Sequence, residues 1–463
     1  MFPPRPGGGE VVFRQGCGLK LPWPGLRSKP EGKKTLTSFT MDSLIAANNK
    51  FCFDFFQEVS KDDIHKNILV CPLSVSAAFG MVCLGARGDS ARQINEVLHF
   101  NELSEDKSKD PNDPCSKSTR EVSDSSLVGQ KEMPVSPDQQ DESTNENEVL
   151  SCHFGKLLSK LDRDKTYYTL SMANRLYAEQ GFPLCQEYSD DVIQYYHTTA
   201  ESVDFQKDTE KSRQEINFWV ESQCQGKIKE LFSKGDIDNS TVLVLVNAVY
   251  FKAKWEKNFD SENTVDAPFS LSENEKKTVK MMNQKGQFRI GFIEELQAQI
   301  LEMKYTMGKI SMLVLLPSHS EDNVKSLQEL EKKISHEKLM AWSTSENMPE
   351  ESVAISFPQF IMEDTYYLNS VLQDMGIKDI YDEKKADLTG ISKSPNLHLS
   401  KIVHKNFVEV DEMGTQAAAA SGAVGAEKAT SSWVEFNANH PFLIFIRHNP
   451  TQQILFCGRV YSP

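Results

Sequence analysis

The sequence predicts one large domain of the α+β class, with helices early in the chain and mixed strands late. Apolar residues recur at helical spacing between residues 41 and 98, whereas long apolar runs and strict alternation dominate beyond residue 240. The chain shows no internal repeat. Of its 463 residues, 39% are hydrophobic, which is enough to bury one sizeable core.

The first predicted helix begins at Met41, where apolar side chains start to recur every three or four residues. These side chains are Leu44, Ala47, Phe51, Phe55 and Val59. A short apolar run follows and ends at Pro72. Ser74 is predicted to cap a helix that runs to Ala86, and Gly88 opens another.

The residue pattern in the later part of the chain predicts mainly strands. The run TVLVLVNAVYFKAKW at 241–255 is too rich in β-branched residues for a typical helix and suits a central strand buried on both faces. Amphipathic helices are predicted over 212–232, 324–342 and 368–375. Further strands are predicted from residue 167 and at 287–293, 310–316, 353–361, 399–410, 433–436, 442–446 and 454–460.

Two segments differ in composition from the rest. Residues 1–40 are basic, with a net charge of +5, rich in proline and glycine, and without the apolar run of a secretory leader. Residues 101–150 carry a net charge of −8 and nine serines, and contain no Phe, Trp, Tyr, Ile or Ala. We expect a disordered N-terminal extension over 1–40 and a disordered acidic insertion loop over 101–150 within one domain at 41–463. A targeting arm and a partner-binding or modified loop are the alternatives.

Composition excludes several classes of function. The net charge of −15 argues against binding to nucleic acid, which needs a basic face. No stretch of 18–20 apolar residues predicts a membrane span. The nine cysteines are scattered without a CxxC pair and are typical of reduced intracellular thiols rather than of disulfides or a zinc site.

The sequence contains no recognisable catalytic motif. There is no P-loop, HExxH, GxSxG or strand-linked GxGxxG pattern, and the ten histidines lack metal-ligand spacing. His404, His440 and His448 lie in strand-like contexts without a paired nucleophile, so structural histidines are the better interpretation. We therefore expect no enzyme activity, no cofactor and no metal.

One segment near the end of the chain is unusual. It leads from VEVDEMGTQ at 408–416 through a run of alanines and glycines to a lone Lys428 and then to Trp433. On composition alone it would be a low-complexity loop or an alanine-driven helix. Glycines at 414, 422 and 425 argue against a long helix.

The motifs around this segment resemble those of the serpins, and specifically of the ovalbumin-like clade B. The hinge of that family resembles EMGTQAAA at 412–419, and its signature resembles FNANHPFLIFI at 436–446. Asn247 and Trp255 match positions of the third strand of the central sheet, Pro72 and Ser74 match the shutter, and His404 matches the fifth strand. The likeness spans residues 41–463. It implies a single-domain fold with three β-sheets, about nine helices and an exposed reactive-centre loop, here 412–433.

The resemblance also implies an activity. A serpin offers its loop to a protease, forms an acyl-enzyme at the scissile bond and inserts the cleaved loop into its central sheet. The hinge residues would be Glu412, Gly414, Thr415 and the four alanines Ala417, Ala418, Ala419 and Ala420, small enough to enter the sheet. The shutter and breach residues would be Pro72, Ser74, Asn247, Trp255 and His404. The chain departs from the family at two positions. Met413 lies where a charged residue is usual, and Cys71 lies where a serine is usual.

Counting sixteen residues forward from Glu412 places the scissile bond at Lys428–Ala429, whereas counting back from Pro441 gives Thr430. The forward count is preferred, because the sheet fixes the insertion length. Lys428 suits a trypsin-like serine protease, whose specificity pocket holds a buried carboxylate. The expected protein is a monomeric cytoplasmic inhibitor that binds neither nucleic acid nor membrane, with unconventional release left open. A non-inhibitory binding or storage serpin and an inhibitor of cysteine proteases are the alternatives.

Overall fold

The predicted α+β organisation is confirmed by the computed structural model. It describes residues 40–61, 63–102, 115, 142–163, 168–320, 323–414 and 432–463, all of which belong to one unit, Thr37–Pro463. Residues 1–39, most of 103–141 and the loop at 415–431 lie outside the described residues.

The described residues form nine α-helices, and six of them lie in the chain before residue 224. The first begins after a capping box, because the Thr40 hydroxyl accepts from the Ser43 N–H at 3.1 Å while the Thr40 N–H donates to the Ser43 hydroxyl at 3.0 Å. The helices are α1 (Met41–Val59), α2 (Pro72–Gly85), α3 (Gly88–Val97), α4 (Glu142–Arg163), α5 (Gln186–Tyr196), α6 (Thr209–Gln223), α7 (Asn323–Lys333), α8 (His336–Trp342) and α9 (Asn369–Met375).

The strands of the described residues pair into two hydrogen-bonded sheets. Their bounds are β1 (Ile68–Val70), β2 (Tyr168–Glu179), β3 (Ala200–Val203), β4 (Leu243–Ala253), β5 (Val265–Ser270), β6 (Lys276–Ile293), β7 (Ala298–Lys304), β8 (Ile310–Pro317), β9 (Glu350–Pro358), β10 (Phe360–Tyr367), β11 (Lys401–Val410), β12 (Val434–Asn437), β13 (Phe442–His448) and β14 (Gln453–Val460).

The central sheet has five strands in the order β10-β11-β4-β2-β3. Its middle pair, β4 and β11, runs parallel, with His404 opposite Asn247 and Lys405 opposite Ala248. The larger sheet has nine strands, with β5 beside β6 and the others in the order β1-β14-β13-β8-β7-β6-β9-β12. The long strand β6 pairs with β9 along one part and with β7 along the other. The resemblance implies three β-sheets, whereas the described strands form two hydrogen-bonded sheets, because β6 pairs with both β7 and β9 and joins the strands on either side of it into one.

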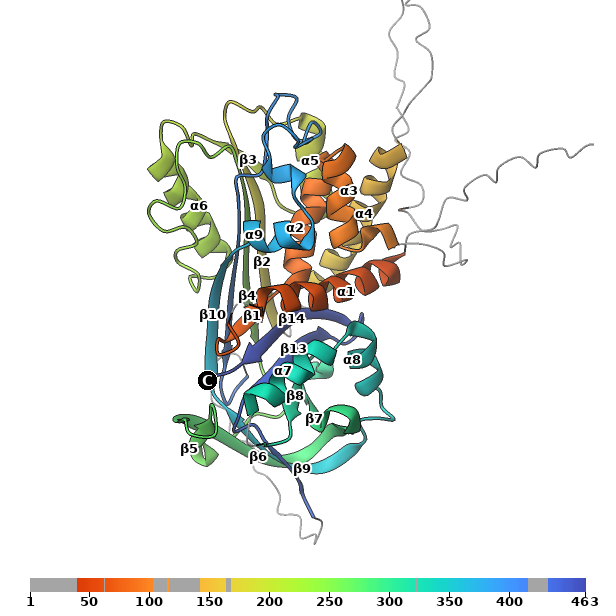
Figure 1. The fold of residues 1–463 in the computed structure, drawn as a ribbon, viewed down its shortest axis with the longest axis vertical. Helices are drawn as coiled ribbons and strands as arrows, with labels where there is room; N and C mark the ends of the chain where they lie inside the picture. The colour runs from red at the N-terminus through yellow and green to blue at the C-terminus, as the bar shows by residue number, and fades with distance from the viewer. Residues whose placement is uncertain are drawn as a thin grey trace, which may run out of the picture. The chain divides into compact units, whose positions relative to one another are not determined.

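The central strand β4 is buried on both faces, as its sequence predicts. Alternate residues join two separate apolar cores because successive side chains of a strand point to opposite sides. Leu245 and Val249 pack toward the side of α2, and Val246 and Ala248 pack toward α6. Figure 1 shows these helices on opposite sides of the sheet. Anything that enters beside β4 must therefore fit between two apolar layers.

The structure corrects several predicted boundaries. The helix predicted over 212–232 ends at Gln223, because Gln225 and Gly226 take left-handed conformations with φ of 53° and 74°. The helix predicted over 324–342 is divided into α7 and α8, since the Ser335 hydroxyl accepts from the Lys338 N–H and caps a new helix. The strand predicted over 353–361 breaks at Gln359 into β9 and β10, which belong to different sheets.

Ser74 does not cap its helix. α2 begins two residues earlier, at Pro72, whose ring suits the first helical position and needs no hydrogen bond there. Ser74 therefore lies in the first turn, and its hydroxyl turns inward to donate to Asn174.

The C-terminal end of the acidic insertion, predicted to be disordered over 101–150, is partly helical. α4 begins at Glu142, inside the segment expected to be disordered, so that part of the prediction is wrong. Cys115 and Cys152 form a disulfide, which contradicts the interpretation of all nine cysteines as reduced thiols. The six cysteines described as free are Cys52, Cys71, Cys83, Cys185, Cys224 and Cys457. Spacing could not reveal the pair, because its members are 37 positions apart in the sequence.

Among the described helices, none combines the length and the apolar character needed to cross a membrane.

Candidate functional site

The predicted shutter residues meet in one buried polar cluster between α2 and the central sheet. We call Ser74, Asn174, Asn247, His404 and Asn406 the shutter cluster. Its members come from α2, β2, β4 and β11, and four of them are completely buried while Asn174 is nearly so. Strand register brings them together, since Asn174 lies opposite Asn247 and Asn247 lies opposite His404.

Hydrogen bonds connect every member of the shutter cluster. The Asn247 amide donates to the Ser74 hydroxyl at 2.8 Å and to Asn174 Oδ1 at 2.7 Å. His404 Nδ1 bonds to Asn247 Oδ1 across the boundary between β11 and β4. The other ring nitrogen, Nε2, accepts from the Cys71 N–H at 3.0 Å and from the Asn406 amide at 2.8 Å. His404 is therefore neutral, with its proton on Nδ1.

The cluster spans the boundary where a new strand would enter. We call the parallel contact between β4 and β11 the seam. His404 and Asn247 join the seam from both sides, and Ser74 ties it to α2. Breaking this contact would leave buried donors and acceptors unpaired, so the cluster favours the closed seam.

Because His404 is buried, its contribution to the free energy of unfolding depends on pH. Desolvation lowers the pKa of His404 to about 3, and the Tyr366 ring stacks on it at 6.1 Å. An unfolded histidine has a pKa of about 6.5, so below pH 6.5 the unfolded chain binds a proton that the folded chain refuses. Stability is therefore full above about pH 6.5 and falls by up to about 1.4 kcal/mol per pH unit as the pH drops toward 3.

We expect the thermal midpoint to fall between pH 7 and pH 5 more steeply in the wild type than in His404→Gln. Circular dichroism melts at several pH values measure both slopes. His336 and His440, whose pKa values burial also lowers, contribute equally to both proteins. Equal slopes would contradict the assignment of the pH dependence to His404.

The second group of predicted residues anchors the start of the loop at one end of the seam. We call residues 411–414, with the side chains that hold them, the hinge anchor. The Trp255 N–H donates to the Met413 carbonyl at 3.0 Å, and the Trp255 indole donates to the Asp411 carbonyl at 3.0 Å. The Phe259 N–H donates to the Glu412 carbonyl at 2.8 Å. The last residue of β11 is thus followed by a turn bonded to the end of β4.

Side chains fix the hinge anchor further. Trp255 stacks on Tyr305 with 4.3 Å between ring centroids, and the Thr264 hydroxyl donates to the Glu412 carboxylate at 2.6 Å. Partial burial raises the pKa of Asp411, whose carboxylate accepts from the Met413 N–H at 2.9 Å.

Gly414 is required where the turn touches β4. Its φ is 112°, a conformation that side chains disfavour, and it bridges to Lys254. An added Cβ would lie 2.4 Å from the Ala253 carbonyl oxygen and 2.6 Å from the Trp255 nitrogen. The glycine expected at the hinge is thus placed by a close backbone contact as well as by backbone freedom.

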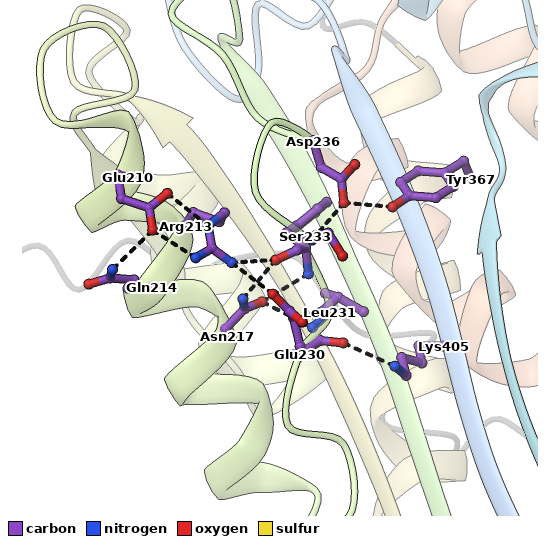
Figure 2. Close-up of polar contacts among 11 residues, drawn as sticks. Glu210, Arg213, Gln214, Asn217, Glu230, Leu231, Ser233, Asp236, Tyr367 and Lys405 are labelled. Carbon is purple, nitrogen blue, oxygen red and sulfur yellow. Dashed lines mark hydrogen bonds and ion pairs between the residues drawn. The ribbon is translucent and has the colours of Figure 1, made fainter.

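A segment after α6 crosses the far side of the seam. We call residues 224–241 the strap. Figure 2 shows its ties to α6, where the Asn217 amide donates to the Phe232 carbonyl at 2.9 Å and Arg213 donates to the same oxygen at 2.6 Å. The apolar side chains of the strap pack on residues of β4 and β11.

Polar contacts tie the strap to β11, one strand of the seam, and to β10 beside it. Lys405 donates to the Glu230 carbonyl at 3.0 Å, and the Tyr367 hydroxyl donates to the Asp236 carboxylate at 2.7 Å (Figure 2). Lys227 pairs with Glu409 at 3.3 Å. A cavity of about 480 Å³ lies between the strap and these strands. Opening the seam must disturb these contacts.

The structure brings together only part of the predicted site. Ser74, Asn247 and His404 meet in the shutter cluster, and Pro72 begins the helix that carries Ser74. Trp255, Glu412 and Gly414 meet at the hinge anchor. Outside the described residues lie the predicted hinge and reactive-bond residues Thr415, Ala417, Ala418, Ala419, Ala420, Lys428 and Ala429. Sequence reasoning missed Asn174 and Asn406. An asparagine inside an apolar strand was the available signal for both, but only register identifies its partners.

Comparisons with known proteins agree with this geometry. A family described as "Serpin (serine protease inhibitor)" matches residues 46–463. The chain is 79% identical to mouse Serpin B12 and 40% identical to mouse Leukocyte elastase inhibitor A, in each case over 423 residues that cover 91% of this chain and 100% of the relative. A crystal structure of uncleaved ovalbumin matches with a TM-score of 0.74 and 34% identity, covering 91% of this chain and all of that one.

Proposed function

Since the chain belongs to the serpin family, we propose that it inhibits trypsin-like serine proteases as a suicide substrate cleaved at Lys428–Ala429. In this proposal the chain supplies no catalytic group and needs no cofactor. It supplies a bond for the protease to attack and a sheet that takes up the cleaved loop.

One observation supports the proposal most directly. The hinge anchor bonds the chain leaving β11 to the end of β4, so Gly414, the last described residue before the loop, lies at the end of the seam. Between this point and Lys428 the side chains are small apart from Gln416, Val424 and Glu427, and none is a bulky apolar residue. A loop that starts there needs only to continue along the seam to become a strand between β4 and β11.

The chemical step belongs to the protease. Its serine oxygen attacks the carbonyl carbon of Lys428, the bond to the Ala429 nitrogen breaks, and the nitrogen takes a proton from the protease histidine and leaves as an amine. An ester then joins the protease to Lys428. The loop is now free at its cleaved end, while its other end stays held by the hinge anchor.

Insertion then competes with hydrolysis of this ester. Sixteen residues at about 3.3 Å each would carry the protease roughly 50 Å along the sheet and distort its active site. Inserted side chains alternate between the two apolar layers that cover β4, so small and uncharged residues enter at least cost. The native fold is then a kinetically trapped state, and insertion is the stabilising step.

The test is incubation with bovine trypsin followed by denaturing gel electrophoresis. We expect a band at the summed mass of inhibitor and protease, because an ester survives denaturation. Mass spectrometry of the released C-terminal peptide should give Ala429 as its first residue. Digestion without a complex would contradict the inhibitory mechanism, and a peptide that begins at Ser431 would move the bond to Thr430.

Lys428→Ala is expected to slow complex formation with trypsin by about 100-fold, since the carboxylate in the specificity pocket loses its cation. Lys428→Arg, which keeps the charge, is the matched control and should retain most of the rate. An unchanged complex with Lys428→Ala would overturn the assignment of this residue.

We further propose that the protein acts in the cytoplasm as a monomer. Six described cysteines are free, which suits a reducing compartment. The disulfide between Cys115 and Cys152 suits an oxidising compartment. Thiol labelling of these two cysteines in cell extracts shows whether the disulfide is formed, and so also tests release from the cell.

A further inference from the structure

We propose that the acidic insertion starts at a pH-dependent latch, in which a protonated His99 holds the chain at Glu102 against α1 and a rise in pH loosens this contact. The latch consists of Lys50, Asp54, His99 and Glu102. Glu102 is the second residue of the insertion and the last described residue before Cys115. The latch shares no residue with the shutter cluster or the hinge anchor and does not rest on the proposed function.

His99 reaches a carboxylate from each of its two ring nitrogens. Its Nε2 lies 2.6 Å from Asp54 Oδ2 on α1, and its Nδ1 lies 3.0 Å from Glu102 Oε1. An ionised carboxylate can only accept a hydrogen bond, and a neutral imidazole carries a single N–H. Both contacts are therefore hydrogen bonds only when His99 is an imidazolium that donates from both nitrogens.

The backbone brings His99 to this position at the end of α3. Its φ of 59° is a left-handed conformation, which is unfavourable for a residue with a Cβ and turns the chain away from the helix. The turn that follows closes where the Glu102 N–H donates to the His99 carbonyl at 3.3 Å. Phe100 is buried against Phe154 of α4, with 5.8 Å between ring centroids. The turn thus faces α4 with an apolar side chain and α1 with charged ones.

The charges around His99 favour its protonated form. The hydrogen bond to Asp54 raises the pKa of His99 most, partial burial lowers it, and the bond to Glu102 raises it further. On the same face of α1, Lys50 pairs with Glu102 and is itself influenced by Glu337 at the start of α8. With the proton, the latch carries two positive and two negative charges. Without it, a nitrogen lone pair faces a carboxylate and one negative charge is left unbalanced.

Loss of the proton should loosen the turn without unfolding it. One of the two hydrogen bonds of His99 is lost, and the pair of Lys50 with Glu102 is an exposed ion pair that contributes little alone. Phe100 stays buried, so the change is confined to residues 99–102. The latch stabilises the fold fully below about pH 6.5, the pKa of an unfolded histidine, and this stabilisation is lost as the pH rises through the folded pKa of His99. His404 acts in the opposite direction.

Nuclear magnetic resonance of protein that carries ¹³C-labelled histidine measures this proton. The resonance missing from His99→Gln identifies His99, which we expect to titrate above about pH 6.5 in the wild type. Asp54→Asn and Glu102→Gln should each lower its pKa, and the double variant should lower it most. Asp89→Asn is the matched control, since Asp89 is an exposed carboxylate of α3 that pairs with Arg92, and should leave the titration unchanged.

Amide hydrogen exchange then shows whether the proton controls the chain. After correction for the intrinsic rate, peptides that cover residues 98–102 should exchange about threefold faster above the pKa of His99 than below it, as expected for the loss of one partly exposed charged contact. His99→Gln should abolish this pH dependence, because glutamine does not titrate. In Asp54→Asn, which leaves the backbone at His99 unaltered, the midpoint of the change should move down with the pKa.

Two results would overturn the proposal. A pKa of His99 at or below about 6.5 in the wild type would exclude an imidazolium bonded at both nitrogens. A raised pKa combined with exchange at 98–102 that follows the intrinsic rate alone would show that the proton does not hold the turn. Neither measurement involves a protease, so failure of the latch and failure of the proposed function are distinguishable. Melting curves check the fold of each variant.

Discussion

Thr415→Arg is expected to turn the inhibitor into a substrate that trypsin cleaves and releases. Thr415 follows the hinge anchor and would be the first residue to enter the seam. The neighbouring strands are covered by apolar layers on both sides, and an unpaired charge buried there costs several kcal/mol. Insertion of the loop then becomes slower than hydrolysis of the ester, and the protease is released. Titration of trypsin with each variant measures this as a rise in the stoichiometry of inhibition by at least about tenfold.

The matched control is Thr415→Ser, which keeps a small hydroxyl side chain and should inhibit like the wild type. Cleavage of the loop should also raise the thermal midpoint of the wild type, since insertion stabilises the sheet, and should fail to do so in Thr415→Arg. A variant that still forms the full amount of covalent complex would show that the loop does not enter the sheet at this residue.

Asn247→Ala should be the most damaging single change in the shutter cluster. Its amide and carbonyl reach Ser74, Asn174 and His404. Removing them leaves the buried His404 Nδ1–H without an acceptor and takes one bond from each of Ser74 and Asn174, which still bond to each other. We expect the free energy of unfolding to fall by about 3 kcal/mol. Because Asn247 also bridges the seam to His404, the variant should lose inhibitory activity on storage faster than the wild type.

Denaturant unfolding and residual inhibition after incubation at 37 °C measure these two effects. Asn239→Ala, at an exposed site in the strap, is the matched control and should change neither. An Asn247→Ala protein with wild-type stability would contradict the account of the cluster as a connected network.

The sequence predicted those features that depend on local pattern. The run at 241–255 identified the central strand because β-branched and aromatic residues fill it on both faces. The glycine at 414 and the small residues after it identified the loop through a resemblance to known motifs. Element type followed from periodicity over most of the described chain.

Features that depend on register or on distant partners could not be predicted. Asn174 joins the shutter only because β2 pairs with β4 in a register that sets it opposite Asn247. The apolar spacing predicts a helix that continues to residue 232, because Ile228 and Leu231 extend the apolar pattern of α6, although both reach the sheet from an irregular segment. Side-chain spacing alone does not distinguish these two ways of burying the same residues.

The disulfide between Cys115 and Cys152 has a consequence for how this chain tolerates variation in length. It closes the chain between two cysteines that are 37 positions apart into a ring whose ends meet at α4, a helix that packs on α2. Residues added inside the ring enlarge it without moving either end, and each doubling of such a ring costs only about 0.6 kcal/mol of closure entropy. The part of this stretch that precedes α4 is therefore where the gene can gain or lose codons, or accept a fused peptide tag, with little effect on the remainder of the fold.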